Sequence, residues 1–172
     1  MGVNDEFGRL ERAGGVSILS FERRLAHPVA RVWRALTEEA DLAAWFPTTV
    51  EGERRDGAAL RFSFRNGEGQ PFDGEMLAFV PPSLLELRWA DDLLRFELEP
   101  DGAGCILRLR VTFPEHGKAA RDAAGWHVCL ERLGSLCDGL APGWDLSAHW
   151  QVVHRAYVER YGPEASTIGP PG

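Results

Sequence analysis

The sequence predicts an α+β fold in which a curled antiparallel sheet wraps around a long helix near the C-terminus. Apolar and polar residues alternate from about residue 48 to residue 113, as in a sheet with one covered face and one wet face. Before this region, and again after it, apolar residues recur with the spacing of an α-helix. With 172 residues, 44% of them hydrophobic, the chain is long enough for one domain with a substantial core.

The chain is expected to open with a flexible leader over residues 1–15, which are mostly polar and end in Gly14-Gly15. This stretch has no apolar run of the kind found in signal peptides. Residues 17–25 are rich in strand-forming side chains and predict the first strand.

Two short helices are predicted after this strand. Pro28 suits a first helical turn, because its missing N–H would have no partner there. The helical spacing i, i+3, i+4 and i+7 then predicts one buried stripe, formed by Val29, Val32, Trp33 and Leu36. Thr37 is expected to cap the second helix, which Pro47 ends.

The alternating region predicts six further strands. Pairs of residues typical of tight turns separate them, such as Asp56-Gly57, Asn66-Gly67 and Asp101-Gly102. With the first strand, the predicted set is 17–25, 48–54, 58–65, 71–80, 84–89, 93–99 and 104–113.

A long helix is predicted over residues 118–140, where the helical period returns. At about 1.5 Å per residue it is roughly 33 Å long, enough to cross the sheet. A last amphipathic helix is expected from Ser147 to Tyr161, packed on the domain or on a second copy in a homodimer. The tail after Gly162 is expected to be disordered. The predicted division is therefore a leader (1–15), the main domain (16–143), and a C-terminal helix with its tail (144–172).

Charge and composition argue against several classes of partner. The net charge is −7, and the arginines alternate with acids instead of clustering, so a nucleic-acid partner is not expected. About 18 consecutive apolar residues are needed to span a membrane, and the sequence has no such run. The three cysteines form neither a C-x-x-C pair nor a disulfide framework, which suggests reduced thiols and a cytoplasmic protein.

Several segments resemble one protein family. They are the run from Arg23 to Thr37 with Trp45 after it, the Gly74-Glu75-Met76 turn, the Pro81-Pro82-x-x-Leu85-x-Leu87-x-Trp89 run and the Gly125-Trp126 pair. These segments resemble homologues of the activator of the ninety-kDa heat-shock protein ATPase. That group is a branch of the SRPBCC superfamily of START-like and birch-pollen-allergen-like proteins. The resemblance covers about residues 16–140 and implies the helix-grip fold with a hydrophobic cavity. Some members bind lipids or hormones, and others cyclise polyketides.

Aromatic and apolar side chains of the predicted sheet and long helix are the expected lining of such a cavity. The predicted set is Trp45, Phe62, Phe64, Trp89, Phe96, Leu109, Trp126, His127 and Leu130. His127 is a weak candidate for a catalytic base, because imidazole titrates near working pH, although a buried and satisfied histidine is the simpler interpretation.

The favoured function is binding of a small hydrophobic or aromatic molecule, without covalent chemistry and without a cofactor. A cyclase or aromatase is the first alternative, and it needs at least two converging polar or titrating groups in the cavity. A co-chaperone or protein-interaction module is the second alternative, and it needs an exposed apolar patch. No metal site is expected, because His149 and His154 lie five residues apart and have no third ligand at a suitable spacing.

Overall fold

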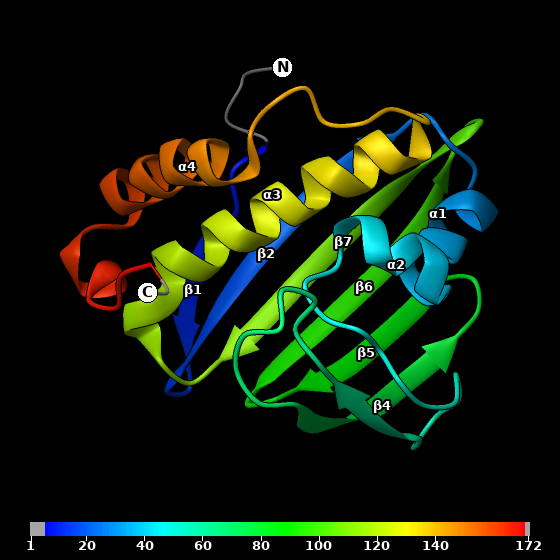
Figure 1. Cartoon of the computed structure of the whole chain (residues 1–172), viewed down its shortest axis with the longest axis horizontal. Coiled ribbons are helices and arrows are strands. Elements are labelled where there is room, and N and C mark those ends of the chain that lie inside the picture. Colours follow the sequence, from blue (N-terminus) through cyan, green and yellow to red (C-terminus); the bar gives the residue numbers. More distant parts are fainter. Residues whose placement is uncertain (1–5, 171–172) are drawn as a thin grey trace.

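The computed structural model describes residues 6–170, which form a seven-stranded antiparallel sheet with helices over one of its faces (Figure 1). The spatial order of the strands is β1-β2-β7-β6-β5-β4-β3. The strands are β1 (Arg9–Ala13), β2 (Val16–Leu25), β3 (Ala59–Phe62), β4 (Phe72–Val80), β5 (Leu84–Trp89), β6 (Asp92–Asp101) and β7 (Gly104–Phe113). This architecture confirms the predicted fold class.

The count of seven strands is right, but one strand differs from the prediction. Residues 48–54 form only two isolated bridges, Thr48 with Phe64 and Glu51 with Arg61, because Gly52 at φ 141° breaks the extended path. The seventh strand is instead β1, which the sequence did not predict. It lies in the segment expected to be a flexible leader. It pairs with β2 from Arg9 to Ala13, and Gly14-Gly15 form the hairpin turn between them.

The two short helices occur where they were predicted, as α1 (Val29–Thr37) and α2 (Glu39–Trp45). Thr37 does not cap α2. It is the last residue of α1, and its hydroxyl donates to the carbonyl oxygen of Trp33 at 2.9 Å. Glu38 occupies the cap position of α2 without a side-chain hydrogen bond. The hydroxyl is therefore used within α1, one turn back along the helix.

Helix α3 (Ala119–Cys137) crosses the face of the sheet diagonally (Figure 1). One of its stripes has the spacing i, i+4, i+7, i+11, i+14 and i+18, and all of its members are buried: Ala119, Ala123, Trp126, Leu130, Leu133 and Cys137. A second buried stripe runs through Ala120, Ala124 and His127. A helix buried on two sides needs cover on both.

Helix α4 (Leu146–Tyr161) supplies that second cover by packing alongside α3 (Figure 1). Its own inner residues, Val153 and Tyr157, are buried, so the last helix packs on its own domain. The tail expected to be disordered instead folds back: a 3-10 turn, η3 (Pro163–Ser166), buries Ala165, and the N–H of Ile168 donates to the carbonyl oxygen of Gly117 at 3.1 Å. No helix within residues 6–170 is long and apolar enough to cross a bilayer.

A buried ion pair joins the start of α3 to the sheet. Asp92 of β6 is only 4% exposed, and both of its carboxylate oxygens accept from Lys118 Nζ at 2.9 Å. Asp122, one turn into α3, lies 3.2 Å from the same ammonium group. Lys118 therefore contacts two carboxylates at the point where the chain leaves the sheet for the helix.

Replacing Lys118 by Met is expected to lower the free energy of unfolding by about 3 kcal/mol or more, because it leaves Asp92 buried without a counter-charge. Arg24 provides the matched control: it pairs with Asp101, but its side chain is 58% exposed. Arg24→Met should cost less than about 1 kcal/mol. Urea unfolding followed by circular dichroism measures both, and equal losses would contradict this assignment.

Candidate functional site

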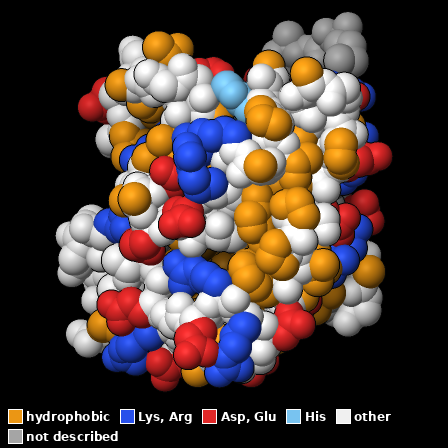
Figure 2. Space-filling view, turned by 90° about the vertical axis from the view of Figure 1, so that its right-hand side faces the viewer, with side chains coloured by type: hydrophobic (Ala, Val, Ile, Leu, Met, Phe, Trp, Pro, Cys, Tyr) orange, Lys and Arg blue, Asp and Glu red, His pale blue; other side chains and the backbone are white. Residues whose placement is uncertain are grey.

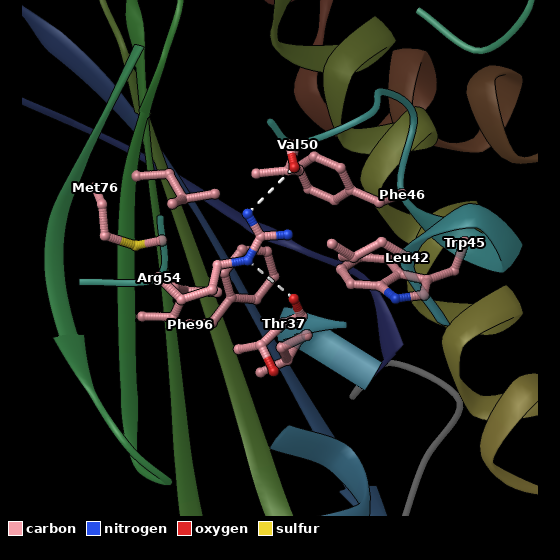
Figure 3. Close-up of a pocket in the computed structure, with 11 residues that line it drawn as sticks. Thr37, Leu42, Trp45, Phe46, Val50, Arg54, Met76 and Phe96 are labelled. Atoms are coloured by element: carbon pink, nitrogen blue, oxygen red, sulfur yellow. Dashed lines mark hydrogen bonds between the residues drawn. The ribbon is translucent and has the colours of Figure 1, made fainter. Parts of the chain in front are cut away.

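A pocket lies between the two short helices and the sheet (Figure 3). It has room for about one water molecule. Helices α1 and α2 line one side, residues 50–54 a second, and strands β4, β5 and β6 the third. The lining residues are Leu36, Thr37, Leu42, Trp45, Phe46, Val50, Arg54, Met76, Leu85, Leu87 and Phe96.

Trp45 lines the pocket on the side of the short helices and is held in place by contacts with α1 and β6. Its side chain is 1% exposed, and the indole N–H donates to the carbonyl oxygen of Ala35 in α1 at 2.8 Å. The indole ring meets the ring of Phe96, from the sheet, edge to face, with centroids 6.0 Å apart. A single side chain thus ties α2 both to α1 and to β6.

Arg54 is the one charged side chain of the lining. Its Nε–H donates to the carbonyl oxygen of Thr37 at 3.0 Å, and Nη1 donates to the carbonyl oxygens of Val50 at 3.2 Å and Gly52 at 3.0 Å. The Thr37 carbonyl is at the C-terminus of α1, where a positive charge is favourable. Among residues 6–170, no carboxylate lies within ion-pair distance of Arg54.

The loop that carries Arg54 depends on Gly52. A Cβ atom at this position would lie 2.5 Å from the carbonyl oxygen of Ala59 and 2.7 Å from a methyl carbon of Leu60. Its φ of 141° is also a conformation that side chains disfavour. Only glycine lets residues 50–54 lie this close to β3 and bring the guanidinium to the pocket.

A second set of aromatic rings fills the space between α3 and the outer strands. Phe46 connects this set to the pocket, because its ring contacts Trp45 at 5.3 Å, Trp126 at 5.8 Å and Trp89 at 6.2 Å between centroids. Trp89 in turn contacts Phe64, and its indole N–H donates to the hydroxyl of Thr48 at 3.2 Å. The rings therefore form a continuous path from the pocket to the surface.

The structure divides the predicted lining residues among three places. Trp45 and Phe96 line the pocket. Trp89, Trp126 and Phe64 belong to the ring path, although Phe64 is 37% exposed because β3 ends at Phe62 and the alternation stops there. The others are core residues outside the pocket lining: Phe62, Leu109, Leu130 and His127. The predicted set did not include the other nine lining residues of the pocket, among them Phe46 and Arg54. Phe46 continues the apolar face of α2, whereas nothing in the segment 51–55 distinguishes Arg54 from a surface arginine.

His127 belongs to the second stripe of α3 and faces α4, so in this structure it does not border the pocket. It is 5% exposed, and its Nδ1 lies 2.8 Å from the hydroxyl of Tyr157 in α4. That hydroxyl accepts from the backbone N–H of Gly8 at 2.8 Å, so we assign its own hydrogen to His127 Nδ1. The imidazole proton is then on Nε2, which faces Glu131 at 3.5 Å.

Burial lowers the pKa of His127 from 6.5 to about 4, and the neighbouring Arg23 and His149 act in the same direction. The carboxylate of Glu131 also accepts from His149 Nε2 at 2.9 Å. A neutral imidazole that bonds Tyr157 holds helix α3, helix α4 and the N-terminal segment together.

The cysteines are protected thiols. All three are free, and burial raises the pKa of each, in Cys129 to about 12. A raised pKa keeps the thiol protonated and unreactive, which is the opposite of what a nucleophile needs. Within residues 6–170, no group of three or more His, Cys, Asp or Glu side chains is placed to hold a metal ion.

Comparison with known proteins agrees with this architecture. The family model described as "Activator of Hsp90 ATPase homolog 1-like protein" matches residues 26–138, more than half of the chain. No curated protein matches the sequence. Among solved structures, a conserved protein of unknown function from Enterococcus faecalis, EF2215, has a TM-score of 0.75 at 20% identity, over 90% of this chain and 90% of that one.

Two further structures show the same fold. CalU16 from Micromonospora echinospora has a TM-score of 0.69 at 21% identity, over 88% of this chain and 94% of that chain. The protein encoded by gene BPP1335 of Bordetella parapertussis has a TM-score of 0.66 at 25% identity, over 90% and 92% of the two chains. These likenesses establish the helix-grip fold of this chain.

Replacing Trp126 by Ala tests whether the aromatic rings between α3 and the outer strands are closely packed. The side chain is 4% exposed and packs against Phe46 and Trp89, so the free energy of unfolding should fall by about 3–5 kcal/mol. Trp144, a half-buried ring stacked on His149, is the control and should lose much less when replaced by Ala. A loss below about 1 kcal/mol for Trp126→Ala would mean that open space borders the ring.

The buried histidine predicts a pH dependence of stability. The pKa of His127 in the folded chain, about 4, is lower than its ordinary 6.5, so the unfolded chain takes up the proton first as the pH falls. Stability that is present above about pH 6.5 is therefore lost between pH 6.5 and pH 4, by about 3 kcal/mol in total. In His127→Asn this contribution should be missing, so the stability difference between the two proteins should shrink toward pH 4. An NMR titration of the His127 ring with a midpoint near 6.5 would refute the assignment.

Proposed function

Because the chain belongs to the family of activator of Hsp90 ATPase homolog 1-like proteins, we propose that it uses the core of the helix-grip fold to bind a small hydrophobic or aromatic molecule. The observation that carries the proposal is the pocket beneath α1 and α2, which is apolar except for Arg54 and the end of α1 at Thr37. Small-molecule sites have this composition: mostly apolar walls, with a few polar groups that orient the ligand. The protein binds its ligand and does not change it.

The pocket as it stands is too small for such a molecule, so a ligand has to widen it. Ligand pockets usually measure about 300–1,000 Å³, far more than this hollow offers. The wall most suited to move is the segment 46–58, because it lacks regular secondary structure, although hydrogen bonds join it to α2, β3, β4 and β5. Apart from those of Arg54, they include Val50 N–H to Glu39 at 3.2 Å and Gly57 N–H to the Met76 carbonyl at 2.7 Å. The lining also contains Met76, a flexible side chain that adapts to irregular guests.

Energetics favour moderate affinity. A guest that buries roughly 400 Å² of apolar surface gains roughly 10 kcal/mol. Opening the pocket and immobilising the guest oppose several kcal/mol of that gain. We therefore expect dissociation constants of roughly 10–100 µM for guests of this size.

The catalytic alternative is less well supported. A cyclase-like reaction needs converging groups that donate and accept protons. Arg54 is the only titratable side chain of the lining, and a guanidinium does not give up its proton in proteins. His127 is bonded to Tyr157 on the other side of α3.

The interaction-module alternative has one observation in its favour. The side of the molecule that carries α1 has a band of hydrophobic side chains flanked by both signs of charge (Figure 2). On α1, Trp33 stacks on Phe79 at the end of β4 with centroids 5.5 Å apart, and the next residue, Val80, is 48% exposed. An apolar surface of this kind suits contact with another protein.

Binding of the neutral fluorescent compound N-phenyl-1-naphthylamine tests the proposal. Its emission should rise when it enters the wild-type pocket. Leu87→Ala enlarges the pocket and should tighten binding by about 5-fold or more, because an apolar cavity accepts an apolar guest. Leu109→Ala is the matched control: Leu109 is equally buried on the sheet but does not line the pocket, so it should lose similar stability without tightening binding.

Near-UV circular dichroism establishes that both variants stay folded, and Leu87→Val repeats the comparison with a smaller loss of stability. A folded wild-type protein that leaves the fluorescence of the compound unchanged would reject the binding proposal in favour of the interaction module. Tighter binding in Leu109→Ala than in Leu87→Ala would move the site to the space beneath α3.

A further inference from the structure

We propose that Arg54 recognises an acidic group, so that the ligand of this pocket is a hydrophobic molecule ending in a carboxylate. This inference rests on the proposed binding function and narrows its ligand class. The observation behind it is an arginine on the wall of an apolar pocket that has hydrogen-bond donors to spare and no acid to neutralise it.

The hydrogen bonds of Arg54 leave one end of the guanidinium unused. Nε and Nη1 direct their three N–H groups to the carbonyl oxygens of Thr37, Val50 and Gly52. Nη2 has no hydrogen-bond partner among residues 6–170. In Figure 3 this third nitrogen points away from the Thr37 and Val50 carbonyls, to the side on which Leu42, Trp45 and Phe46 lie.

Capping of α1 explains only part of this arrangement. The bond from Nε to Thr37 satisfies a terminal carbonyl of the helix, and a positive charge there is favourable. A cap of this kind needs neither the two N–H groups on Nη2 nor an apolar surface beside them. The three carbonyl bonds have another effect: they hold the guanidinium in one place, so a ligand loses little affinity to the ordering of this side chain.

The neighbouring arginines show what the fold does with charges that it neutralises itself. Arg31 pairs with Asp41 at 2.9 Å, and Arg65 pairs with Glu39 at 2.9 Å, both beside α2. Arg65 also donates to the carbonyl oxygen of Phe46 at 2.9 Å, which makes it similar to Arg54 in its backbone bonding. Acids outnumber basic residues by 26 to 19 in this chain, yet none of the acids within residues 6–170 is paired with Arg54. A partly buried cation in such a chain favours an anion from outside.

The geometry favours a carboxylate over a phosphate. One nitrogen with two N–H groups can hold one anionic oxygen strongly, in a charge-assisted hydrogen bond. A phosphate with nearly two negative charges would need further cations, and Arg54 is the only one in the lining. The apolar walls then take the body of the molecule, from Leu36 and Phe46 on one side to Leu87 on the other.

A matched pair of ligands tests this directly. The acid 4-phenylbutanoate and the alcohol 4-phenylbutan-1-ol share the same apolar body and differ in the end group. Isothermal titration at pH 7.5 should show wild-type protein binding the acid about 10- to 100-fold more tightly than the alcohol, the value of one charged hydrogen bond. Arg54→Gln should abolish this preference and change the affinity for the alcohol little, whereas Arg54→Lys should keep part of it.

The control variant is Arg65→Gln, which removes an arginine with similar backbone bonds but with an acid of its own, and it should keep the full preference. Equal binding of acid and alcohol by the wild-type protein would overturn this inference while leaving the proposed function intact. Failure of both compounds to bind would overturn the two together. If Arg54→Gln does not fold, the Nε–H NMR signal of Arg54 in the wild-type protein decides: it should shift with the acid and stay in place with the alcohol, and identical shifts would refute the inference.

Discussion

Burial of α3 on two faces is the constraint on which the rest of this structure depends. The stripe through Trp126 and Leu130 lies against the sheet, and the stripe through Ala120, Ala124 and His127 lies against α4. Because the sheet covers only one of these faces, α4 and the N-terminal segment have to complete the core. The hydrogen bonds of Tyr157 to His127 and to Gly8 are the polar part of that closure.

The large rings under α3 decide where space for a ligand remains. The space between α3 and the outer strands is filled by three rings that contact one another, those of Trp89, Trp126 and Phe46. Close packing of this kind leaves no room for a guest without displacing rings. The remaining hollow lies toward α1 and α2, where the wall is the irregular segment 46–58. A ligand site in this protein is therefore tied to the short helices more than to the long one.

Arg54 has both a structural role in that wall and the proposed role in ligand recognition. Its three backbone bonds join the end of α1 to the loop around Gly52, and Gly52 in turn allows the loop to lie against Ala59 of β3. The same bonds fix the guanidinium at the edge of an apolar space. A charge that is oriented by the backbone and not cancelled by an acid is suited to select ligands by their end group.

The sequence by itself determined the fold class, both short helices, the long helix and six of the seven strands, because hydrophobic period is a local signal that reports which face of an element is covered. It also determined that Trp45 and Phe96 lie in the core. Only the tertiary structure decided that β1 pairs with β2, that residues 48–54 are irregular, and that His127 faces α4 and not the ligand pocket. Only the tertiary structure, too, brings Arg54 to the end of α1, 17 residues away along the chain. The physical reason is that these features depend on contacts between segments far apart in the sequence. Two apolar stripes on one helix look alike in sequence, and only the packed structure shows what covers each. A charged residue in a loop likewise acquires its role from carbonyl groups that only the folded chain places around it.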